Sequence, residues 1–469
     1  MQAFQKANVP EEVGLSSRSI LEYLRAVEAS GLEHHSIKVL RHGVEAVTMN
    51  FAPYDDRTPH LLFSLSKSFT SAAAGFAVQE GRLSWDSKVS EVLKEDMQDS
   101  ASEALKGVTL HHLLCMGSGL KAESDRIDGS QPAWARRVLA CDLDHLPMEH
   151  FHYNSHGTYL VSCMVQKVAG MNVRDYLMPR LFEPLGIPAP DFDMSPDGVC
   201  CGGWGLHLSS DSIARFGQCL LQKGVWEGRQ VLPPEWLSRA TAYQIDNSNG
   251  SPDPNNEWHQ GYGYQFWRCR DHRFRGDGMY GQLCMVDPAR NMVVAVTAGL
   301  DDMGLEMKLL HDYLFPAADA EPGTQEEQQA LKTCLGELSH PWPGKVLDAA
   351  AMPQGRLVGE RAELQLRGDM GRILARLRRD DQVQEVLFGM EHPYLNVPIH
   401  QMSEIPTRLL AMAGTGSDGT ITFLARSLDE PGFVRLRLAR DAADRDVWIL
   451  VVDGCGAEKA QYSLKKEGN

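Results

Sequence analysis

A serine and a lysine three residues apart, Ser64 and Lys67, stand at the start of a helix pattern built from small and apolar residues. Such residues recur at helical spacing until Gly81: Phe69, Ala72, Ala73, Phe76 and Ala77. This period is typical of a buried helix. Because positions i and i+3 share one face of a helix, the Lys67 amine can reach the Ser64 hydroxyl. Once deprotonated, that amine can accept the hydroxyl proton and make the serine a nucleophile.

The Ser-x-x-Lys spacing occurs three times in the chain, so context has to select among the matches. The serines concerned are Ser64, Ser118 and Ser463. Ser118 lies between two glycines, which indicates a helix end and a turn, and Ser463 lies in a polar C-terminal tail that we expect to be disordered. Only Ser64 opens a predicted helix. The alternative interpretation of Ser64 is an ordinary N-terminal capping serine.

The charge of the chain excludes some classes of partner. Lys and Arg number 46 against 62 for Asp and Glu, a formal net charge of −16. An acidic protein is repelled by phosphate backbones and by acidic membrane surfaces. We therefore expect neither nucleic acid nor a membrane as a partner.

The N-terminus and the cysteines indicate the compartment. Residues 1–8 lack the apolar core and the cleavage site of a secretory signal, and no uncharged stretch is long enough to span a bilayer. The ten cysteines contain no C-x-x-C pair, so we expect them to be mostly reduced and buried. These features predict a cytoplasmic protein.

The order of the expected elements predicts an α/β (α+β) domain with helices inserted into a sheet. A strand pair is expected at 36–49 around Gly43, and helices at 64–80, 105–114, 159–170 and 210–223, the last capped by Ser210 or Asp211 and ended by Gly224. Strand patterns return at 261–267, 282–286 and 292–298, before a helix at 301–314. The simplest assembly joins the N-terminal hairpin and the late strands in one sheet, with the intervening helices as a second lobe.

At 469 residues, the chain is longer than one hydrophobic core usually supports. We expect a first domain at 1–320, a linker with a charged helix at 321–345, and a small β-rich domain at 346–469. Alternation at 362–366, 421–425 and 434–438 predicts an antiparallel barrel or sandwich in the last part. It contains no catalytic constellation, and its role is open, including interaction or oligomerisation.

A nucleophilic serine needs a proton donor for the leaving group, and Tyr153 is the best candidate. It lies in a polar turn just before a predicted helix. A phenol near a lysine ammonium has its anion favoured, so Tyr153 beside Lys67 could relay the Ser64 proton. Taken alone, such a tyrosine is more often a packing or capping residue.

With these motifs, the chain resembles the serine β-lactamase and penicillin-binding-protein superfamily, closest to class C β-lactamases and related esterases and amide hydrolases. The resemblance covers about residues 15–315 and rests on the segments 64–70 (SLSKSFT), 112–120 (HLLCMGSGL), 153–155 (YNS), 182–187 (FEPLGI) and 276–282 (GDGMYGQ). It implies a transpeptidase-like antiparallel sheet with an inserted helical lobe. It also implies that Ser64 is acylated, that Lys67 is its base and that Tyr153 is the second-motif tyrosine.

Two departures from the family pattern bear on the substrate. The second motif is usually Tyr-x-Asn, and here Ser155 replaces the amide. The third motif is usually Lys-Thr-Gly, and here it is 276–278, Gly-Asp-Gly, without the lysine that helps bind a substrate carboxylate. Arg275 could supply that charge instead. The pattern therefore favours an esterase or amidase over an enzyme acting on penicillins or D-alanyl peptides.

The resemblance further implies an oxyanion hole and a substrate pocket. The N–H groups of Ser64 and Met279 would hold the oxyanion, with a close approach of the edge strand at Gly278. Trp204 lies in a stretch that returns toward the cleft. The expected substrate-binding residues are Ser155, Trp204, Arg275, Asp277 and Gly278.

The implied reaction is two-step acyl transfer on a small-molecule ester, amide or lactam, without cofactor or metal. The histidines at 145–156 match no zinc motif. Two alternatives remain: a β-lactamase or D-alanyl peptidase, and a non-hydrolytic acyl-binding sensor that keeps the fold. A homo-oligomer is also possible.

Overall fold

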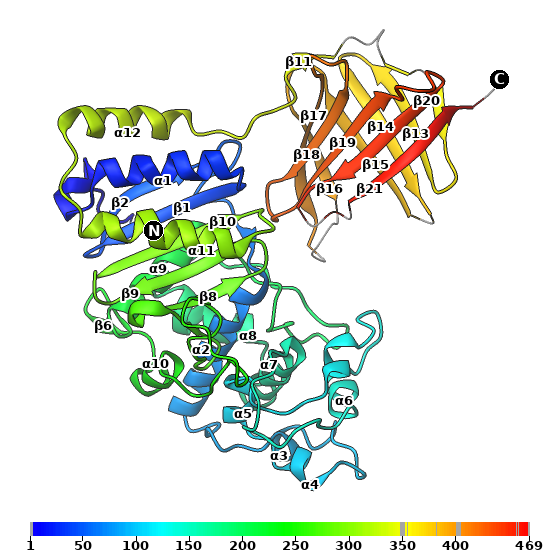
Figure 1. Ribbon diagram of the computed structural model, residues 1–469. Coiled ribbons are helices and arrows are strands. Elements are labelled where there is room, and N and C mark those ends of the chain that lie inside the picture. Colours follow the sequence, from blue (N-terminus) through cyan, green and yellow to red (C-terminus); the bar gives the residue numbers. More distant parts are fainter. Residues whose placement is uncertain are drawn as a thin grey trace. The chain divides into compact units, whose positions relative to one another are not determined.

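The computed structural model describes residues 3–347, 352–353, 355–380, 382–399, 405–455, 457 and 459–467. The chain divides into two compact units, each with a hydrophobic core of its own (Figure 1). The first comprises Met1–Phe51, Asp55–Ala298 and Asp302–Leu338. The second comprises Ala52–Tyr54, Gly299–Asp301 and Ser339–Asn469.

The first unit is built on a six-stranded antiparallel sheet in the order β2-β1-β10-β9-β8-β7. Its strands are β1 (His34–Arg41), β2 (Val44–Asn50), β7 (Trp267–Arg268), β8 (Phe274–Gly278), β9 (Gln282–Asp287) and β10 (Met292–Ala298). The N-terminal hairpin pairs with the late strand β10, which confirms the predicted assembly. β9 and β10 are buried along their whole length, so they form continuous apolar runs. Of the strand predicted at 261–267, only the last residue lies in a strand.

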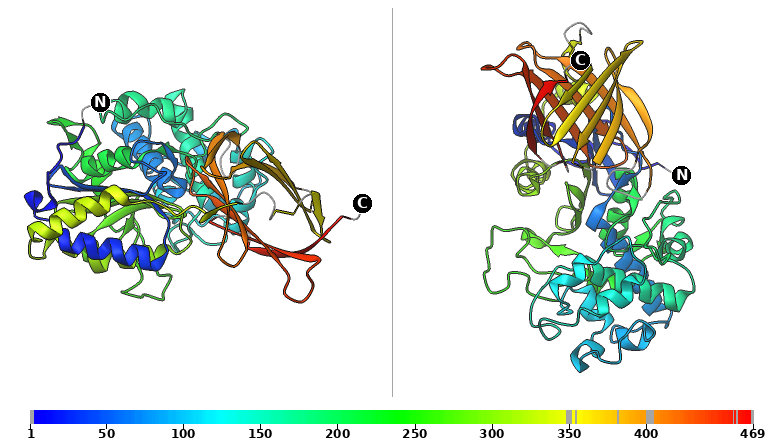
Figure 2. Two further views of the ribbon diagram at one scale, coloured as in Figure 1. Left: turned by 90° about the horizontal axis from the view of Figure 1, so that it is seen from above. Right: turned by 90° about the vertical axis from the view of Figure 1, so that its right-hand side faces the viewer.

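Helices cover both faces of this sheet (Figure 2). One layer contains α1 (Ser17–Ser30), α11 (Met303–Leu309) and α12 (Gln325–Glu337), and α9 (Ser210–Leu221) packs on β1, β9 and β10 from the other side. The expected helix at 301–314 is α11 followed by a π turn. The expected cap of α9 was wrong by one residue: Ser209 accepts from the N–H of Ser212 at 3.2 Å. Asp211 instead pairs with Lys38 at 2.8 Å.

The helical lobe lies between β2 and β7 in the sequence. Its helices are α2 (Ser66–Gln79), α3 (Val89–Val92), α4 (Glu103–Lys106), α5 (Leu110–Leu114), α6 (Trp134–Leu139), α7 (Ser155–Ala169), α8 (Val173–Leu177) and α10 (Pro234–Ala240). Two small strand pairs accompany them, β3 (His60–Leu61) with β4 (His207–Leu208) and β5 (Val225–Trp226) with β6 (Arg229–Gln230). Short 3-10 or π turns lie at Pro10–Val13, Phe63–Leu65, Ala122–Arg126, Met178–Phe182, Arg270–His272, Leu310–Leu314 and Pro316–Ala318.

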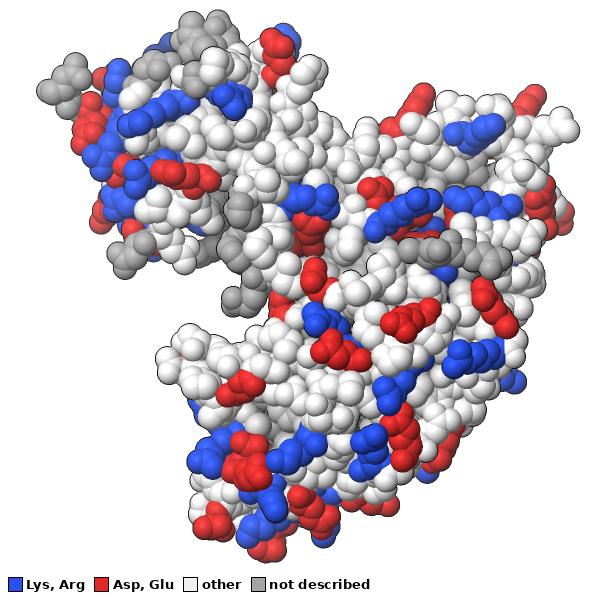
Figure 3. Space-filling view, turned by 180° about the vertical axis from the view of Figure 1, so that it is seen from behind, with Lys and Arg blue, Asp and Glu red and all other residues white. Residues whose placement is uncertain are grey.

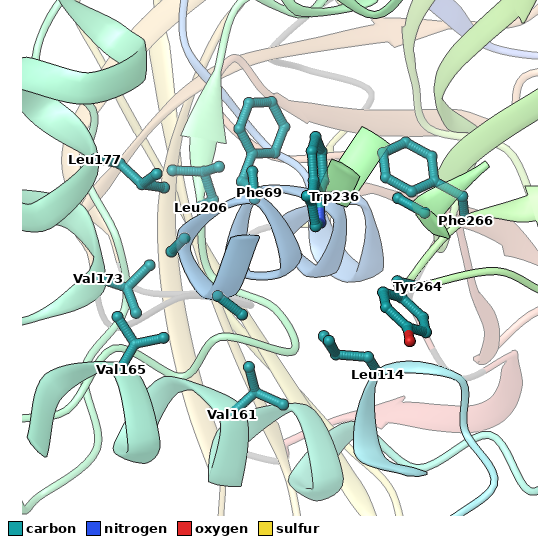
Figure 4. Packing of buried hydrophobic residues seen from close by; sticks show 14 of the residues in the cluster. Phe69, Leu114, Val161, Val165, Val173, Leu177, Leu206, Trp236, Tyr264 and Phe266 are labelled. Carbon is teal, nitrogen blue, oxygen red and sulfur yellow. The ribbon is translucent and has the colours of Figure 1, made fainter. Parts of the chain in front are cut away.

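Helix α2 is buried, as its small residues predicted, and other elements of the lobe surround it. Figure 4 shows it surrounded by side chains from several elements, among them Trp236 and Tyr264. A Cβ added at Gly75 would lie 2.4 Å from Cγ of Trp236, so the indole rests directly on the helix backbone. The indole Nε1 also donates to Ser71 Oγ at 2.9 Å. The helix therefore packs against α10 at a distance that only glycine permits.

Helix α12 belongs to the first unit. Its N-terminus carries a capping box between Thr324 and Glu327, and Glu327 also pairs with Arg18 of α1 at 2.7 Å. The chain passes into the second unit at Ser339, inside the segment 321–345 where the sequence predicted a linker with a helix.

The second unit contains the C-terminal β-barrel. Its strands are β11 (Lys345–Val346), β12 (Gly355–Val358), β13 (Ala362–Asp369), β14 (Arg372–Arg379), β15 (Gln382–Gly389), β16 (Tyr394–Ile399), β17 (Thr407–Thr415), β18 (Ile421–Ser427), β19 (Phe433–Arg440), β20 (Val447–Asp453) and β21 (Ala460–Lys466). The ladder runs β11-β17-β15-β14-β13-β12-β21-β20-β19-β18, and β17 also pairs with β18, which closes it. The three alternating segments predicted here lie in β13, β18 and β19. Ser463, expected in a disordered tail, instead lies in β21 and pairs with Ile449.

The charged residues and the cysteines counted in the sequence can now be placed in the structure. On the face shown in Figure 3, acidic and basic side chains are interspersed and no broad area carries one sign. All ten cysteines are free, and all except Cys141 and Cys334 are buried. Within the described ranges, no helix combines the length and the apolar character needed to cross a bilayer.

We predict that Gly75→Ala lowers the stability of the protein, because the added methyl group meets the buried Trp236 ring and overpacks the core. The expected loss is about 1–3 kcal/mol, measured by thermal or denaturant unfolding. The matched control is Gly336→Ala in α12, where a Cβ has no atom within 4 Å. That substitution gains helix propensity and is expected to leave stability unchanged or raise it by up to about 1 kcal/mol. Equal stability of the two variants would contradict the close packing.

Candidate active site

Ser64 lies in the tight turn that precedes α2. The first residue of this turn, Phe63, has φ 47°, in the left-handed region that bulky residues rarely adopt. The N-cap position of α2 is Leu65, and no side chain caps it. The capping interpretation of Ser64 was therefore wrong.

The Lys67 amine lies within hydrogen-bond distance of three oxygens. Its Nζ atom is 3.0 Å from Oγ of Ser64, 3.0 Å from Oγ of Ser155 and 2.7 Å from the carbonyl oxygen of Gly203. The lysine itself is only 1% exposed. The structure thus brings together Ser64, Lys67 and Ser155, and adds Gly203, which the sequence analysis did not identify.

Burial lowers the pKa of Lys67 to about 7, because an ammonium group loses its hydration there. The carboxylates of Asp125 and Asp277 oppose this shift. Asp125 is a further residue that sequence reasoning missed. It accepts from the backbone N–H of His156 at 2.9 Å and lies 3.1 Å from Nδ1 of that ring. Near neutral pH, Lys67 is therefore present in both protonation states.

Tyr153 lies beside the same lysine. Its ring stacks on Trp267 with centroids 5.4 Å apart, and Nζ of Lys67 is 4.8 Å from the Tyr153 centroid. Burial, and then the charge of Asp277, raise the pKa of Tyr153 above its usual value, and a hydrogen bond with Ser64 opposes them. The expectation that the lysine would favour the phenolate was therefore wrong, because desolvation of the phenol outweighs its charged neighbours. Tyr153 stays protonated at neutral pH.

Two backbone segments hold the partners of Lys67 in place. Ser155 is the first residue of α7, whose N-cap is Asn154. A Cβ on Gly203 would lie 2.6 Å from the carbonyl oxygen of Ser155, so only glycine lets the two segments approach. Thr70 of α2 donates to the carbonyl oxygen of Gly202 at 2.8 Å. The adjacent glycines are the one sequence signal that could have indicated this approach.

The glycine before Met279 lets β8 lie against the turn that carries Ser64. A Cβ on Gly278 would be 2.0 Å from the carbonyl oxygen of Leu62. Strand β7 pairs only with Phe274 and Arg275 of β8, so the later part of β8 is an edge. The sequence predicted that the edge strand approaches the substrate closely at this glycine. The structure shows that Gly278 also approaches the backbone of the turn that carries Ser64. The Met279 side chain is 55% exposed.

The position of the third-motif lysine is closed in this protein. A Cβ on Gly276 would lie 2.5 Å from both Cδ1 of Leu65 and Oγ of Ser68. Leu65 and Ser68 therefore occupy the space into which a longer side chain at this position would extend. A cationic side chain at this point of β8 would require the Leu65 and Ser68 side chains to move.

Arg275 does not replace that lysine. It is fully buried, lies 3.0 Å from the Asp277 carboxylate and donates to the carbonyl oxygen of Glu257 at 3.2 Å. The indole of Trp258 covers its guanidinium at 4.9 Å and donates to Asp277 at 3.2 Å. The expectation that Arg275 offers its charge to a substrate was wrong, because the arginine is neutralised and enclosed by its own neighbours. Trp258 was not found by sequence reasoning.

Trp204 is half-buried in an aromatic cluster next to Gly203. It stacks on Trp134 at 6.0 Å and meets His156 edge to face at 5.3 Å. This cluster adjoins the carbonyl group that contacts Lys67. In the part of the chain that the structure describes, no group of three or more His, Cys, Asp or Glu side chains is arranged to hold a metal ion.

The chain belongs to the Beta-lactamase family, whose sequence model matches residues 27–313. Over 275 residues it is 24% identical to the 6-aminohexanoate-dimer hydrolase of Paenarthrobacter ureafaciens, a match that covers 54% of this chain and 68% of that protein. The resemblance to the serine β-lactamase and penicillin-binding-protein superfamily is thereby confirmed.

Solved structures share the β-lactamase/transpeptidase-like fold. An octameric penicillin-binding protein homologue from Pyrococcus abyssi is 16% identical, with a TM-score of 0.51, and the match covers 96% of this chain and 99% of that one. A family VIII carboxylesterase is 13% identical, with a TM-score of 0.52 and coverage of 64% and 96%. At these identities the likeness concerns the fold alone.

We predict that the Lys67 amine is half protonated near pH 7, protonated below and neutral above. The measurement is a pH titration by NMR of lysine-labelled protein, with the signal assigned by its loss in Lys67→Met. Because the Asp125 charge favours the ammonium form, Asp125→Asn should lower this pKa further. The matched control is Asp128→Asn, an exposed residue nearby on the same stretch of chain, which should not shift it. An ordinary lysine pKa in the wild type would contradict the burial of this amine.

Proposed function

We propose that this protein is a serine hydrolase that acts on a small-molecule ester or amide through an acyl-enzyme. The observation that carries the proposal is the contact of the Ser64 hydroxyl with a buried lysine amine whose pKa is about 7. A base with this pKa is available at neutral pH and still holds a proton well enough to return it.

The hydrogen bonds of Lys67 favour the orientation that a base requires. A neutral amine has two N–H bonds and one lone pair. The Gly203 carbonyl can only accept, so it takes one N–H, and the Ser155 hydroxyl accepts the other. The lone pair is then left for the proton of Ser64. Ser155 thus supplies, as a hydroxyl, the acceptor that an amide provides in the usual second motif.

The reaction begins with attack on the substrate carbonyl. As the Ser64 Oγ–carbon bond forms, its proton moves to Lys67, and the carbonyl oxygen becomes an oxyanion held by the N–H groups of Ser64 and Met279. Tyr153, protonated at rest, gives its proton to the leaving group and takes one from Lys67. The leaving group then departs, and water hydrolyses the acyl-enzyme by the reverse proton path.

The charges around the site support a substrate without a carboxylate beside the scissile bond. Gly276 offers no cation, and Arg275 is enclosed by Asp277 and Trp258. The carboxylates of Asp125 and Asp277 act on both Lys67 and Tyr153 and so make the site unfavourable for an anion. The relative from Paenarthrobacter ureafaciens is named a 6-aminohexanoate-dimer hydrolase, which agrees with the proposed hydrolytic activity.

We predict that Ser64→Ala lowers kcat/KM for a chromogenic short-chain ester by about 10³-fold or more and abolishes covalent labelling by a fluorophosphonate. The loss of the nucleophile removes the only atom that the proposed mechanism acylates. The measurements are steady-state turnover and intact-protein mass. The matched control is Ser118→Ala, the other Ser-x-x-Lys serine of this domain, which should keep the label. A single burst without turnover in the wild type would identify an acyl-binding sensor instead.

We also predict that a neutral p-nitrophenyl ester is hydrolysed with a kcat/KM at least about tenfold higher than that for a chromogenic cephalosporin. The site lacks the charge-assisted hydrogen bond that a lactam carboxylate needs, which is worth about 1.5–3 kcal/mol. The methyl ester of the same cephalosporin serves as the control and should react no more slowly than the free acid. Preference for the free acid would favour the β-lactamase or D-alanyl peptidase alternative.

A further inference from the structure

Two aromatic residues flank the proposed oxyanion hole: Phe63 directly precedes Ser64, and Tyr280 directly follows Met279. Both have left-handed backbone angles, φ 47° for Phe63 and φ 65° for Tyr280. Bulky residues rarely adopt this conformation, so their surroundings must hold them there. Their rings meet edge to face, with centroids 5.3 Å apart and planes at 75°. The turn that carries Ser64 and the turn that carries Met279 therefore contact each other through the two residues with left-handed backbone angles.

Hydrogen bonds also fix the backbone of each turn. Leu62 donates its N–H to the carbonyl oxygen of Leu206 at 2.9 Å. On the other turn, the buried Gln282 side chain donates to the carbonyl oxygens of Met279 and Tyr280 at 3.2 and 3.1 Å. The missing side chain of Gly278 lets the two turns meet. The Phe63–Tyr280 ring pair joins the two turns through side chains.

We propose that Phe63 and Tyr280 form an aromatic clasp that sets the spacing of the two oxyanion donors. They are positioning residues, because they act through the N–H groups of Ser64 and Met279. The inference rests on the proposed function, since those groups matter only if an oxyanion forms.

The geometry of the peptide bond explains how the clasp acts. The Ser64 N–H belongs to the peptide unit that joins Ser64 to Phe63, so a rotation about the Phe63 backbone turns this donor. The Met279 N–H belongs to the peptide unit shared with Gly278, so Tyr280 does not turn this donor directly and acts by fixing the turn immediately after it. Displacement of a group in an active site by about 1 Å can reduce the rate about 10²-fold. Because the donors bind the oxyanion more tightly than the carbonyl, the loss should appear in kcat and leave KM nearly unchanged.

The test is a double-substitution cycle in the full-length protein. Phe63→Leu and Tyr280→Leu remove one ring each, and the double variant removes both. Phe63→Tyr and Tyr280→Phe keep both rings. The matched control is Tyr313→Leu, in the turn after α11. The measurements are kcat and KM for a chromogenic ester, the rate of fluorophosphonate labelling and the melting temperature.

Each leucine variant should lose about 10- to 100-fold in kcat and in labelling rate, with KM within about twofold. The double variant should lose about as much activity as either single variant, because each single substitution already removes the same ring contact. The ring-keeping variants and Tyr313→Leu should stay near the wild-type rate. The inference is overturned if the two losses multiply, if KM rises while kcat holds, or if the ring-keeping variants lose as much as the leucine variants.

Phe63→Gly separates the clasp from simple stability. Glycine relieves the left-handed strain, so the melting temperature should hold or rise, whereas kcat should fall because the ring is gone. A glycine variant with the wild-type kcat overturns the inference. An active wild type with any of these contrary results overturns the clasp alone, whereas a wild type without Ser64-dependent turnover or labelling overturns the proposed function and the clasp with it.

Discussion

The burial of one amine is the constraint on which this structure depends most. A buried ammonium is costly, so Lys67 has to be surrounded by acceptors or lose its proton, and here both occur. Its three oxygen partners come from the turn before α2, the first residue of α7 and the segment around Gly203. These segments are far apart in the sequence. The contacts that hold the base therefore also hold the helical lobe around α2.

The second constraint on the structure is the close approach of packed segments, and a glycine allows it at each of three contacts. Gly75 admits the Trp236 ring to α2, Gly203 admits the 202–206 segment to α7, and Gly278 admits β8 to the turn at Ser64. At each point a single methyl group would collide with an atom that has no room to move. Close packing of this lobe therefore also fixes the geometry of the site, because the spacing between the packed segments decides where the hydrogen-bond donors and the Lys67 amine lie.

The charges near the site are arranged in pairs, and this arrangement decides its chemistry. Asp277 is held by Arg275 and Trp258, and Asp125 is held by the backbone N–H of His156, so each carboxylate has a fixed position. The expectations about Arg275 as a carboxylate ligand and about a Tyr153 phenolate were wrong for one reason. Both rested on charge alone, whereas burial decides which groups are accessible and which can ionise. The roles of Ser64, Lys67 and Tyr153 in catalysis stay predictions.

The sequence by itself determined the hairpin at β1–β2, the buried helix that starts beside Ser64, the late strands β9 and β10 and the alternating strands of the barrel, because these features follow from local periodicity and turn residues. It also indicated the pairing of Ser64 with Lys67, since a three-residue spacing on a helix is a local distance. Only the tertiary structure decided the Gly203 carbonyl contact, the influence of Asp125, the enclosure of Arg275 and the pKa of Lys67. These depend on desolvation and on contacts between distant segments, which no spacing within the sequence specifies.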